Sequence, residues 1–229
     1  MNIIEIPKIT PLGKSVSTVG IWLSGGADSA LLCYMLAEYI LQQNLDIKIQ
    51  PITIDYKRPF AEKAVFVQQK ISEILNANDI FCEHVVYHPP ENITWTPDEL
   101  SEQFHIRNYE HFKNGLFQVL FSGITTNPSL EVQQTFNWGV LQDVELKRGS
   151  DIPKEINRYF VHPEGGEFWE LKPFFNLNKQ KLAELYKDKN LLDNLFPITR
   201  SCEHIGTVHG HCGNCWWCEE RRWAFGRLE

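Results

Sequence analysis

Short apolar runs alternate with longer amphipathic segments along the first half of the chain. An apolar run of strand length indicates a buried strand, and apolar residues that recur three or four positions apart indicate a helix. The pattern predicts strands over 18–23, 48–54, 80–86 and 119–121, and helices over 28–43, 60–75, 107–118 and 178–187. Because strands and helices alternate with short links, we expect an α/β fold with a doubly wound parallel sheet.

Two parts of the chain break this alternation. Residues 87–106 hold three prolines among polar positions, which is typical of a loop. Residues 130–170 are rich in aromatic side chains but follow neither a helix nor a strand period, so the pattern predicts no element there. We divide the chain into an α/β domain over 1–195 and a small C-terminal unit over 196–229.

The net charge of −7 and the sequence pI of about 5.6 indicate which kind of molecule the protein binds. Proteins that bind tRNA usually carry a basic surface, and the clearest basic cluster here is only the pair Lys147-Arg148. The charge favours a small-molecule substrate over a nucleic acid. No apolar run is long enough to cross a membrane, and residues 1–14 do not resemble a signal peptide. We therefore expect a cytoplasmic protein.

A glycine-containing loop, Leu23-Ser24-Gly25-Gly26-Ala27-Asp28-Ser29, joins the first expected strand to the first expected helix. Two adjacent glycines allow a tight turn that exposes backbone N–H groups, and the helix start adds a partial positive charge, so a phosphate is favoured there. Ser24 and Ser29 add hydroxyl donors, and Asp28 is placed to cap the helix or to help hold Mg²⁺. The loop lacks the spacing and the lysine of a Walker-type loop. An ordinary capped helix start is the alternative interpretation.

Four of the six cysteines lie close together near the C-terminus, namely Cys202, Cys212, Cys215 and Cys218. In a cytosolic protein such a cluster indicates a metal site rather than disulfides. Four thiolates bind Zn²⁺ tetrahedrally and leave no open position, so this zinc would be structural. An iron–sulfur cluster is the rival, although the upstream cysteine and the lack of a Cys-Pro end favour zinc. The nearby His204, His209 and His211 offer a replacement for one thiolate.

Together, the two motifs resemble those of the 7-cyano-7-deazaguanine synthase family, in the PP-loop ATP pyrophosphatase superfamily. The glycine loop matches the Ser-Gly-Gly-x-Asp-Ser PP-loop. Residues 201–225 resemble the family's Ser-Cys followed by His-Cys-Gly-x-Cys-x-x-Cys-x-Glu-Arg-Arg-x-Ala-Phe. The resemblance covers the first 60 and the last 60 residues and implies an adenine nucleotide α-hydrolase-like fold.

Weaker matches lie between the two motifs. Asp55-Tyr56 resembles the family's Asp-Tyr-Gly-Gln, but Lys57-Arg58 replaces Gly-Gln. Lys179 stands at the lysine of a Pro-Leu-x-x-Leu-x-Lys helix start, and Arg107-Asn108 resembles an Arg-Asn pair. The loop over 123–128 departs from the family's Gly-Val-Asn pattern, in the region where substrate selectivity would be built.

The resemblance implies that 7-carboxy-7-deazaguanine and ammonia are converted to 7-cyano-7-deazaguanine with ATP and Mg²⁺. Adenylation makes a carboxylate oxygen a leaving group, ammonia attack gives an amide, and a second activation gives the nitrile. It implies that residues 23–29 and Asp55 bind the nucleotide, that Ser24, Asp28, Ser29 and Lys179 act in catalysis, and that a homodimer forms. For Lys179, a solvated lysine at the start of a helix is an equal alternative. Arg107 would meet the substrate carboxylate, and a surface salt bridge is the equal alternative for it.

Three other functions remain open. A divergent relative would activate a deazaguanine carboxylate and stop at the amide, or couple it to another amine. A binding module would keep the metal knuckle and an inactive nucleotide fold, which the intact glycine loop disfavours. A tRNA-thiolating enzyme is disfavoured by the acidic charge and by the positions of Cys33 and Cys82, which are poorly placed for a catalytic pair.

Overall fold

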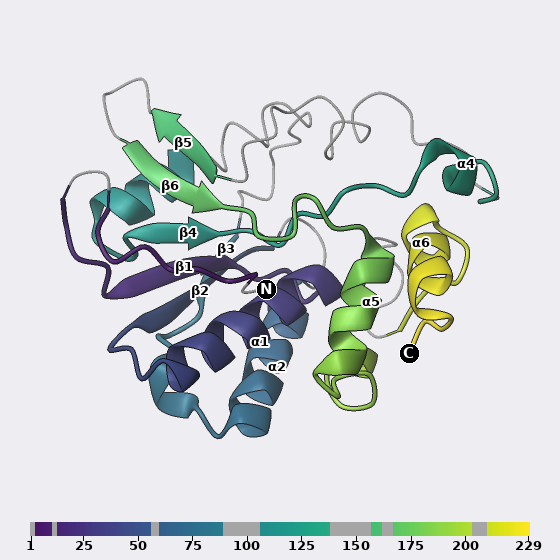
Figure 1. The fold of residues 1–229 in the computed structure, drawn as a ribbon, viewed down its shortest axis with the longest axis horizontal. Coiled ribbons are helices and arrows are strands. Elements are labelled where there is room, and N and C mark those ends of the chain that lie inside the picture. The colour runs from purple at the N-terminus through teal and green to yellow at the C-terminus, as the bar shows by residue number, and fades with distance from the viewer. Residues whose placement is uncertain are drawn as a thin grey trace.

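A six-stranded sheet in the order β3-β2-β1-β4-β6-β5 forms the centre of the protein (Figure 1). The computed structural model describes residues 3–10, 13–55, 60–88, 106–137, 157–161, 167–202 and 210–229. The strands are β1 (Thr18–Trp22), β2 (Lys48–Ile54), β3 (Val85–Tyr87), β4 (Val119–Phe121), β5 (Asn157–Val161) and β6 (Glu167–Leu171). All neighbouring pairs are parallel except β5 and β6, which are antiparallel.

The strand order reverses beside β1. The chain leaves β1 for β2 and β3 on one side and returns to β4 on the other. Ligands of such sheets bind outside the carboxyl ends of the strands at this switch point, because the two connections diverge there. The glycine loop follows β1 directly, so the fold places it at the switch point.

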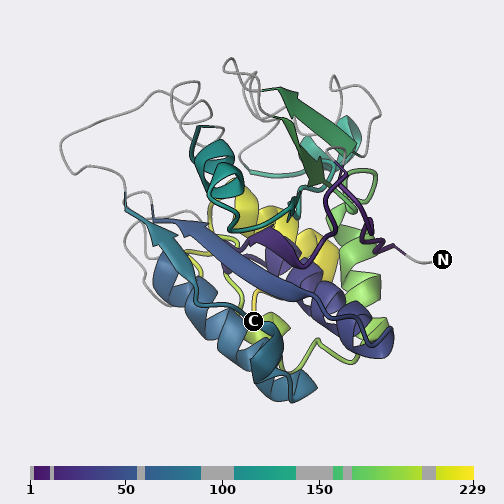
Figure 2. The same ribbon diagram turned by 90° about the vertical axis from the view of Figure 1, so that its left-hand side faces the viewer.

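Helices α1 (Ala27–Gln42) and α2 (Phe60–Leu75) pack side by side on one face of the sheet (Figure 2). Alternate β1 residues point to opposite faces: Val19 and Ile21 join the large core, whereas Trp22 packs with Phe117 in a second cluster. A further helix spans residues 106–113, and the other labelled helices are α4 (Leu130–Gln133), α5 (Lys179–Asp188) and α6 (Trp216–Phe225), with 3-10 turns η1 (Asn78–Ile80) and η2 (Phe196–Ile198). Helix α5 contacts both α1 and α6, and thereby joins the C-terminal segment to the sheet domain.

The alternation of strands and helices is confirmed, and the α/β fold with it. The strand expected over 80–86 is wrong in position, because the regular ladder with β2 begins only at Val85. Before that, Phe81 makes a single bridge to Ile49, and the side chain of Gln50 bonds the backbone of Glu83 in place of a ladder bond. The helix expected over 107–118 is shorter, since residues 106–113 are helical and Gly115 then takes a positive φ of 75°.

The sequence predicted irregular chain over residues 87–106 and 130–170, and the two segments differ in outcome. The 130–170 segment contains the β5–β6 hairpin, which the apolar pattern did not indicate. The expected loop over 87–106 falls mostly on residues 89–105, which lie outside the described part of the chain. None of the described helices has the length and apolar character that a membrane crossing requires.

Candidate active site and metal centre

The glycine loop makes a tight turn at Gly25, where the backbone conformation favours glycine. Gly25 has a φ of +74°, and a Cβ atom there would lie 2.7 Å from Lys63 Cγ and 3.0 Å from the backbone nitrogen of Ala64. Ser29 Oγ donates to the carbonyl of Gly26 (3.2 Å) and accepts from the backbone N–H of Ser24 (3.2 Å). These bonds fix the loop before any ligand binds. The N-cap of α1 is Gly26, which has no side chain to cap the helix, so within the described residues the N–H groups of the first turn are available to an anion.

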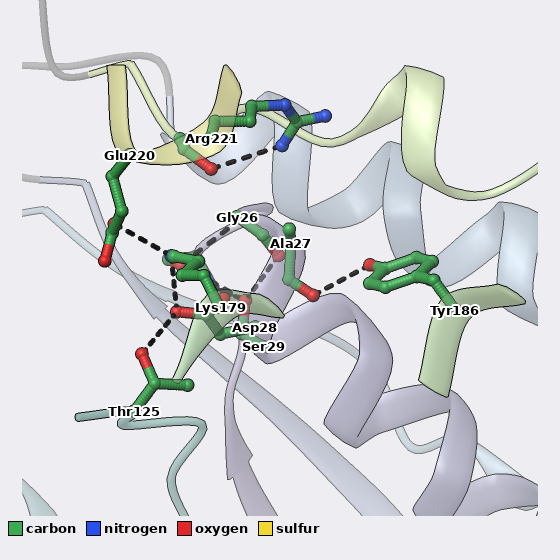
Figure 3. A network of polar contacts seen from close by, with 11 residues as sticks. Gly26, Ala27, Asp28, Ser29, Thr125, Lys179, Tyr186, Glu220 and Arg221 are labelled. Atoms are coloured by element: carbon green, nitrogen blue, oxygen red, sulfur yellow. Dashed lines mark hydrogen bonds and ion pairs between the residues drawn. The ribbon is translucent and has the colours of Figure 1, made fainter. Parts of the chain in front are cut away.

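Asp28 bonds to side chains from two distant segments instead of capping the helix (Figure 3). Its Oδ2 accepts from Lys179 Nζ at 2.7 Å and from Thr125 Oγ1 at 3.4 Å. Its other oxygen, Oδ1, is buried and accepts no hydrogen bond within the described part of the chain. A carboxylate oxygen of this kind beside a phosphate loop fits a Mg²⁺ ligand, because Mg²⁺ binds one or two carboxylates together with phosphate oxygens.

Lys179 is buried in this network rather than solvated. Its side chain is 5% exposed, and Nζ also lies 3.5 Å from Oε2 of Glu220, whose side chain is 1% exposed. Asn178 caps α5, because its side-chain oxygen accepts from the N–H of Lys181. Tyr186 on the same helix donates from its hydroxyl to the carbonyl of Ala27 at 2.7 Å. Helix α5 is thus fastened to the start of α1 at two points.

Two residues of this network were not predicted from the sequence, Thr125 and Glu220. Thr125 lies in the loop after β4, where a Cβ on Gly123 would come within 3.0 Å of the backbone of Asp28 and Ser29. That close approach brings the 123–125 segment against the glycine loop. The departure of residues 123–128 from the family pattern was the one sequence signal pointing to this loop. Glu220 lies two residues after the last cysteine, and nothing in the sequence pattern indicated its burial.

Cations surround the glycine loop on its α2 and C-terminal sides. The N–H of Arg200 donates to the carbonyl of Gly25 at 2.9 Å. Arg221 is fully buried and donates to the carbonyls of Phe196 (2.9 Å) and Thr199 (3.2 Å), and burial lowers its pKa to about 10. Burial, followed by the charges of Arg200 and Arg221, lowers the pKa of Lys63. The potential at the loop therefore favours a polyanion.

A second group of polar side chains lies at the carboxyl ends of β2 and β3. Asp55 Oδ2 is 3.5 Å from Nδ1 of His88, and the guanidinium of Arg107 lies 4.6 Å from the centre of the Tyr87 ring. Arg107 also forms an exposed ion pair with Glu110 at 2.7 Å, which is the surface salt bridge of the alternative interpretation. The structure thus places Asp55 and Arg107 on the β2–β3 side of the switch point. Lys57-Arg58 lie outside the described residues.

The four C-terminal cysteines converge on one point. All four Sγ atoms lie within 4.8 Å of one another, with Cys215 Sγ 3.5 Å from Cys218 Sγ and 3.8 Å from Cys202 Sγ. Sulfurs bound at about 2.3 Å to one tetrahedral ion lie about 3.8 Å apart, so these cysteines could hold a metal ion. The ligand sulfurs of a cubane cluster surround four irons and must stand further apart.

His211 is the described histidine beside this cluster, with Nδ1 3.8 Å from Cys218 Sγ. Burial and then the charge of Arg221 lower its pKa to about 4, so it is neutral at pH 7. Four sulfurs converge without His211, which lies beside them. The other two histidines of the sequence-based alternative, His204 and His209, lie outside the described residues.

The start of α6 packs against the segment that contains α4. Trp216 and Trp217 form an aromatic cluster with Phe136, and Asn137 Nδ2 donates to Glu219 Oε1 at 2.5 Å. The two tryptophans thus contact the chain that follows β4, while Glu220, further along α6, lies beside Lys179.

Comparison of the sequence with protein-family models and with curated protein sequences finds no match. Several solved structures are similar to this chain in fold. The U34-tRNA thiolase NcsA from Methanococcus maripaludis, with its 4Fe–4S cluster, is 17% identical with a TM-score of 0.45, over 76% of this chain and 57% of that one. An NAD⁺ synthetase from Burkholderia pseudomallei is 10% identical (TM-score 0.36, 93% of this chain and 75% of that one). An FMN adenylyltransferase variant from Candida glabrata is 15% identical (TM-score 0.37, 89% and 63%).

The chain spans 57% of the length of the thiolase, and all three identities are low. The assignments that follow therefore rest on the residues of this chain.

Proposed function

We propose that the protein is an ATP-dependent carbon–nitrogen ligase that adenylates the carboxylate of 7-carboxy-7-deazaguanine and uses ammonia to form 7-cyano-7-deazaguanine. The observation that carries the proposal is the convergence of Asp28, Lys179 and the open first turn of α1 at the switch point of the sheet. This arrangement supports binding of a nucleoside triphosphate with its metal. The identity of the acceptor rests on the resemblance of the two motifs.

Each group at the glycine loop has a role in this reaction. The N–H groups of residues 25–29 bind the β and γ phosphates, and Ser24 and Ser29 position them. Asp28 would hold Mg²⁺ through its unpartnered Oδ1, and the ion would supply positive charge to the departing pyrophosphate. Lys179 would bind phosphate oxygens beside the loop, while Asp28 and Glu220 balance its charge. The carboxylate oxygen of the substrate attacks the α phosphorus, pyrophosphate leaves, and ammonia then displaces AMP to give the amide.

The second activation repeats this sequence on the amide oxygen. Loss of AMP from the adenylated amide then leaves the nitrile. The Asp55, Tyr87 and Arg107 group lies at the same edge of the sheet, and its charged and aromatic surfaces suit a flat, polar purine with a carboxylate. We propose that the nucleotide or acceptor reaches this group.

We propose that the four cysteines hold one structural Zn²⁺. Sulfur–sulfur distances of 3.5 Å, 3.8 Å and 3.9 Å support a single tetrahedral ion over a cluster. Four sulfur ligands leave no position for a substrate, so this metal would stabilise the C-terminal segment and take no part in the chemistry.

One alternative function keeps the same site. A relative that stops at the amide, or that couples the activated carboxylate to another amine, would need the same loop and lysine. Thiolation of tRNA has less support, because Cys33 is fully buried and burial raises the pKa of its thiol, so it would be a poor nucleophile.

A product assay tests the proposal. The protein is incubated with ATP, Mg²⁺, ammonia and 7-carboxy-7-deazaguanine, and products are identified by mass spectrometry, with Asp28→Asn and Lys179→Met as inactive controls. We expect the nitrile together with AMP and pyrophosphate. Amide alone would move the assignment to the amide-forming relative. Absence of AMP and pyrophosphate from the folded, zinc-containing protein with this acceptor would refute the proposal.

A further inference from the structure

Lys63 lies directly over the first glycine of the phosphate loop. It is in the first turn of α2, and its Cγ atom would be only 2.7 Å from a Cβ atom on Gly25. The side chain is half-buried, and it makes no hydrogen bond or ion pair within the described part of the chain. The helix starts of α1 and α2 therefore meet here with a lysine between them.

Two arginines and two carboxylates act on the charge of Lys63. Arg200 is anchored to the carbonyl of Gly25 through its own N–H, and the buried Arg221 follows on the same side. Their charges, after burial, lower the pKa of Lys63, while Glu62 and Glu229 act in the opposite direction. Lysine in the first turn of a helix also opposes the helix dipole. Burial and the two arginines therefore disfavour the charged form of Lys63 in the absence of a ligand. An anion bound between these cations would favour the charged form.

We propose that Lys63 binds the pyrophosphate end of ATP and the pyrophosphate product, opposite Lys179 across the glycine loop. This inference rests on the proposed use of ATP but not on the identity of the acceptor. Lys179 approaches the loop from α5 through Asp28, and Lys63 approaches it from α2 through Gly25. Two lysines from different helices would then share the charge that develops on the leaving group.

The plain alternative is that Lys63 only packs its aliphatic stem on Gly25 and keeps its ammonium in water. Methionine preserves the stem and removes the charge, so the Lys63→Met variant separates the two roles. Lys70 provides a matched control, because it lies on the same helix and pairs with Glu73 at 3.1 Å near the surface. Lys70→Met changes the net charge equally, away from the loop.

The experiment is calorimetric titration of the full-length, metal-loaded protein and both variants, with pyrophosphate in Mg²⁺ and, separately, with AMP. We expect Lys63→Met to weaken pyrophosphate binding by about 10-fold or more, the value of one charge-assisted hydrogen bond. AMP binding should stay within about 2-fold, and Lys70→Met should leave both within that range. Lys63→Arg, which keeps the charge, should recover most of the affinity.

Equal pyrophosphate affinity in the Lys63→Met and Lys70→Met variants would overturn the inference, and so would a wild-type protein that does not bind pyrophosphate. Thermal melting and metal content, measured on the same samples, identify a variant that has lost its fold; Lys63→Arg then carries the comparison. Failure of the proposed function would look different: no nitrile or amide would form, although the dependence of pyrophosphate binding on Lys63 remained.

Discussion

Replacing Lys179 by methionine should destabilise the protein strongly, because this one cation serves two carboxylates. Nζ lies 2.7 Å from Asp28 and 3.5 Å from Glu220, and the side chains of the three residues are 5%, 17% and 1% exposed. Removing one partner of a buried ion pair costs about 3–5 kcal/mol, since it leaves a charge without compensation. Methionine fills nearly the same volume, so a cavity should add little to this cost. We expect a loss of about 3 kcal/mol or more in the free energy of unfolding.

Most of this loss should come from Glu220, the more deeply buried carboxylate. The Lys179→Met/Glu220→Gln double variant should therefore recover about half of the loss or more, which a double-mutant cycle measures by urea unfolding at pH 7. Lys181→Met is the control: its pair with Glu184 is 59% and 61% exposed, and exposed pairs contribute at most about 1 kcal/mol. A Lys179→Met variant as stable as Lys181→Met, or a double variant no more stable than Lys179→Met, would refute this account of the network.

Three further predictions concern the loop, the cysteines and a buried histidine. Gly25→Ala should cost about 1–2 kcal/mol or more of stability and reduce ATP binding, because φ at Gly25 is +74° and a Cβ atom there would lie 3.0 Å from the backbone of α2. In Gly26→Ala the new Cβ atom meets nothing closer than 3.4 Å, so this variant should bind ATP normally. Elemental analysis should find one zinc per chain, and Cys218→Ser should remove it and lower the melting temperature. Burial lowers the pKa of His84 to about 4, so the unfolded chain takes up its proton first and stability should fall by up to about 3 kcal/mol as the pH drops from about 6.5 to 4. His84→Gln should flatten that fall in unfolding experiments.

The sequence predicted the sheet domain where side-chain patterns are local. Apolar runs separated by amphipathic helices identified β1, β2, β4, α1 and α2 within one or two residues. The glycine loop was found in the same way, because a positive φ and two adjacent glycines are properties of a short segment. Position in the sheet then followed from the rule for parallel strands.

The β5–β6 hairpin was missed because its central part buries charge. Glu170 on β6 pairs with Lys172 at 3.1 Å, and the two side chains are 8% and 5% exposed. A strand pattern that counts charged residues as exposed assigns these positions to the surface. The ion pair between Glu170 and Lys172 forms only in the folded chain, so the period of apolar residues alone does not reveal the strand.

Charged residues are also buried in α6, and there they link the metal centre to the candidate active site. Its sequence reads as a charged surface helix, yet Glu220 and Arg221 are 1% and 0% exposed. Glu220 balances Lys179 at the glycine loop, and Arg221 holds the backbone of 196–201, through which Arg200 reaches Gly25. Both lie within one turn of Cys218, so a metal bound there would fix the start of the helix that carries them. A metal bound by the cysteines would therefore stabilise the segment that carries Glu220 and Arg221, and these two residues connect the cysteine motif to the glycine loop through Lys179 and Arg200.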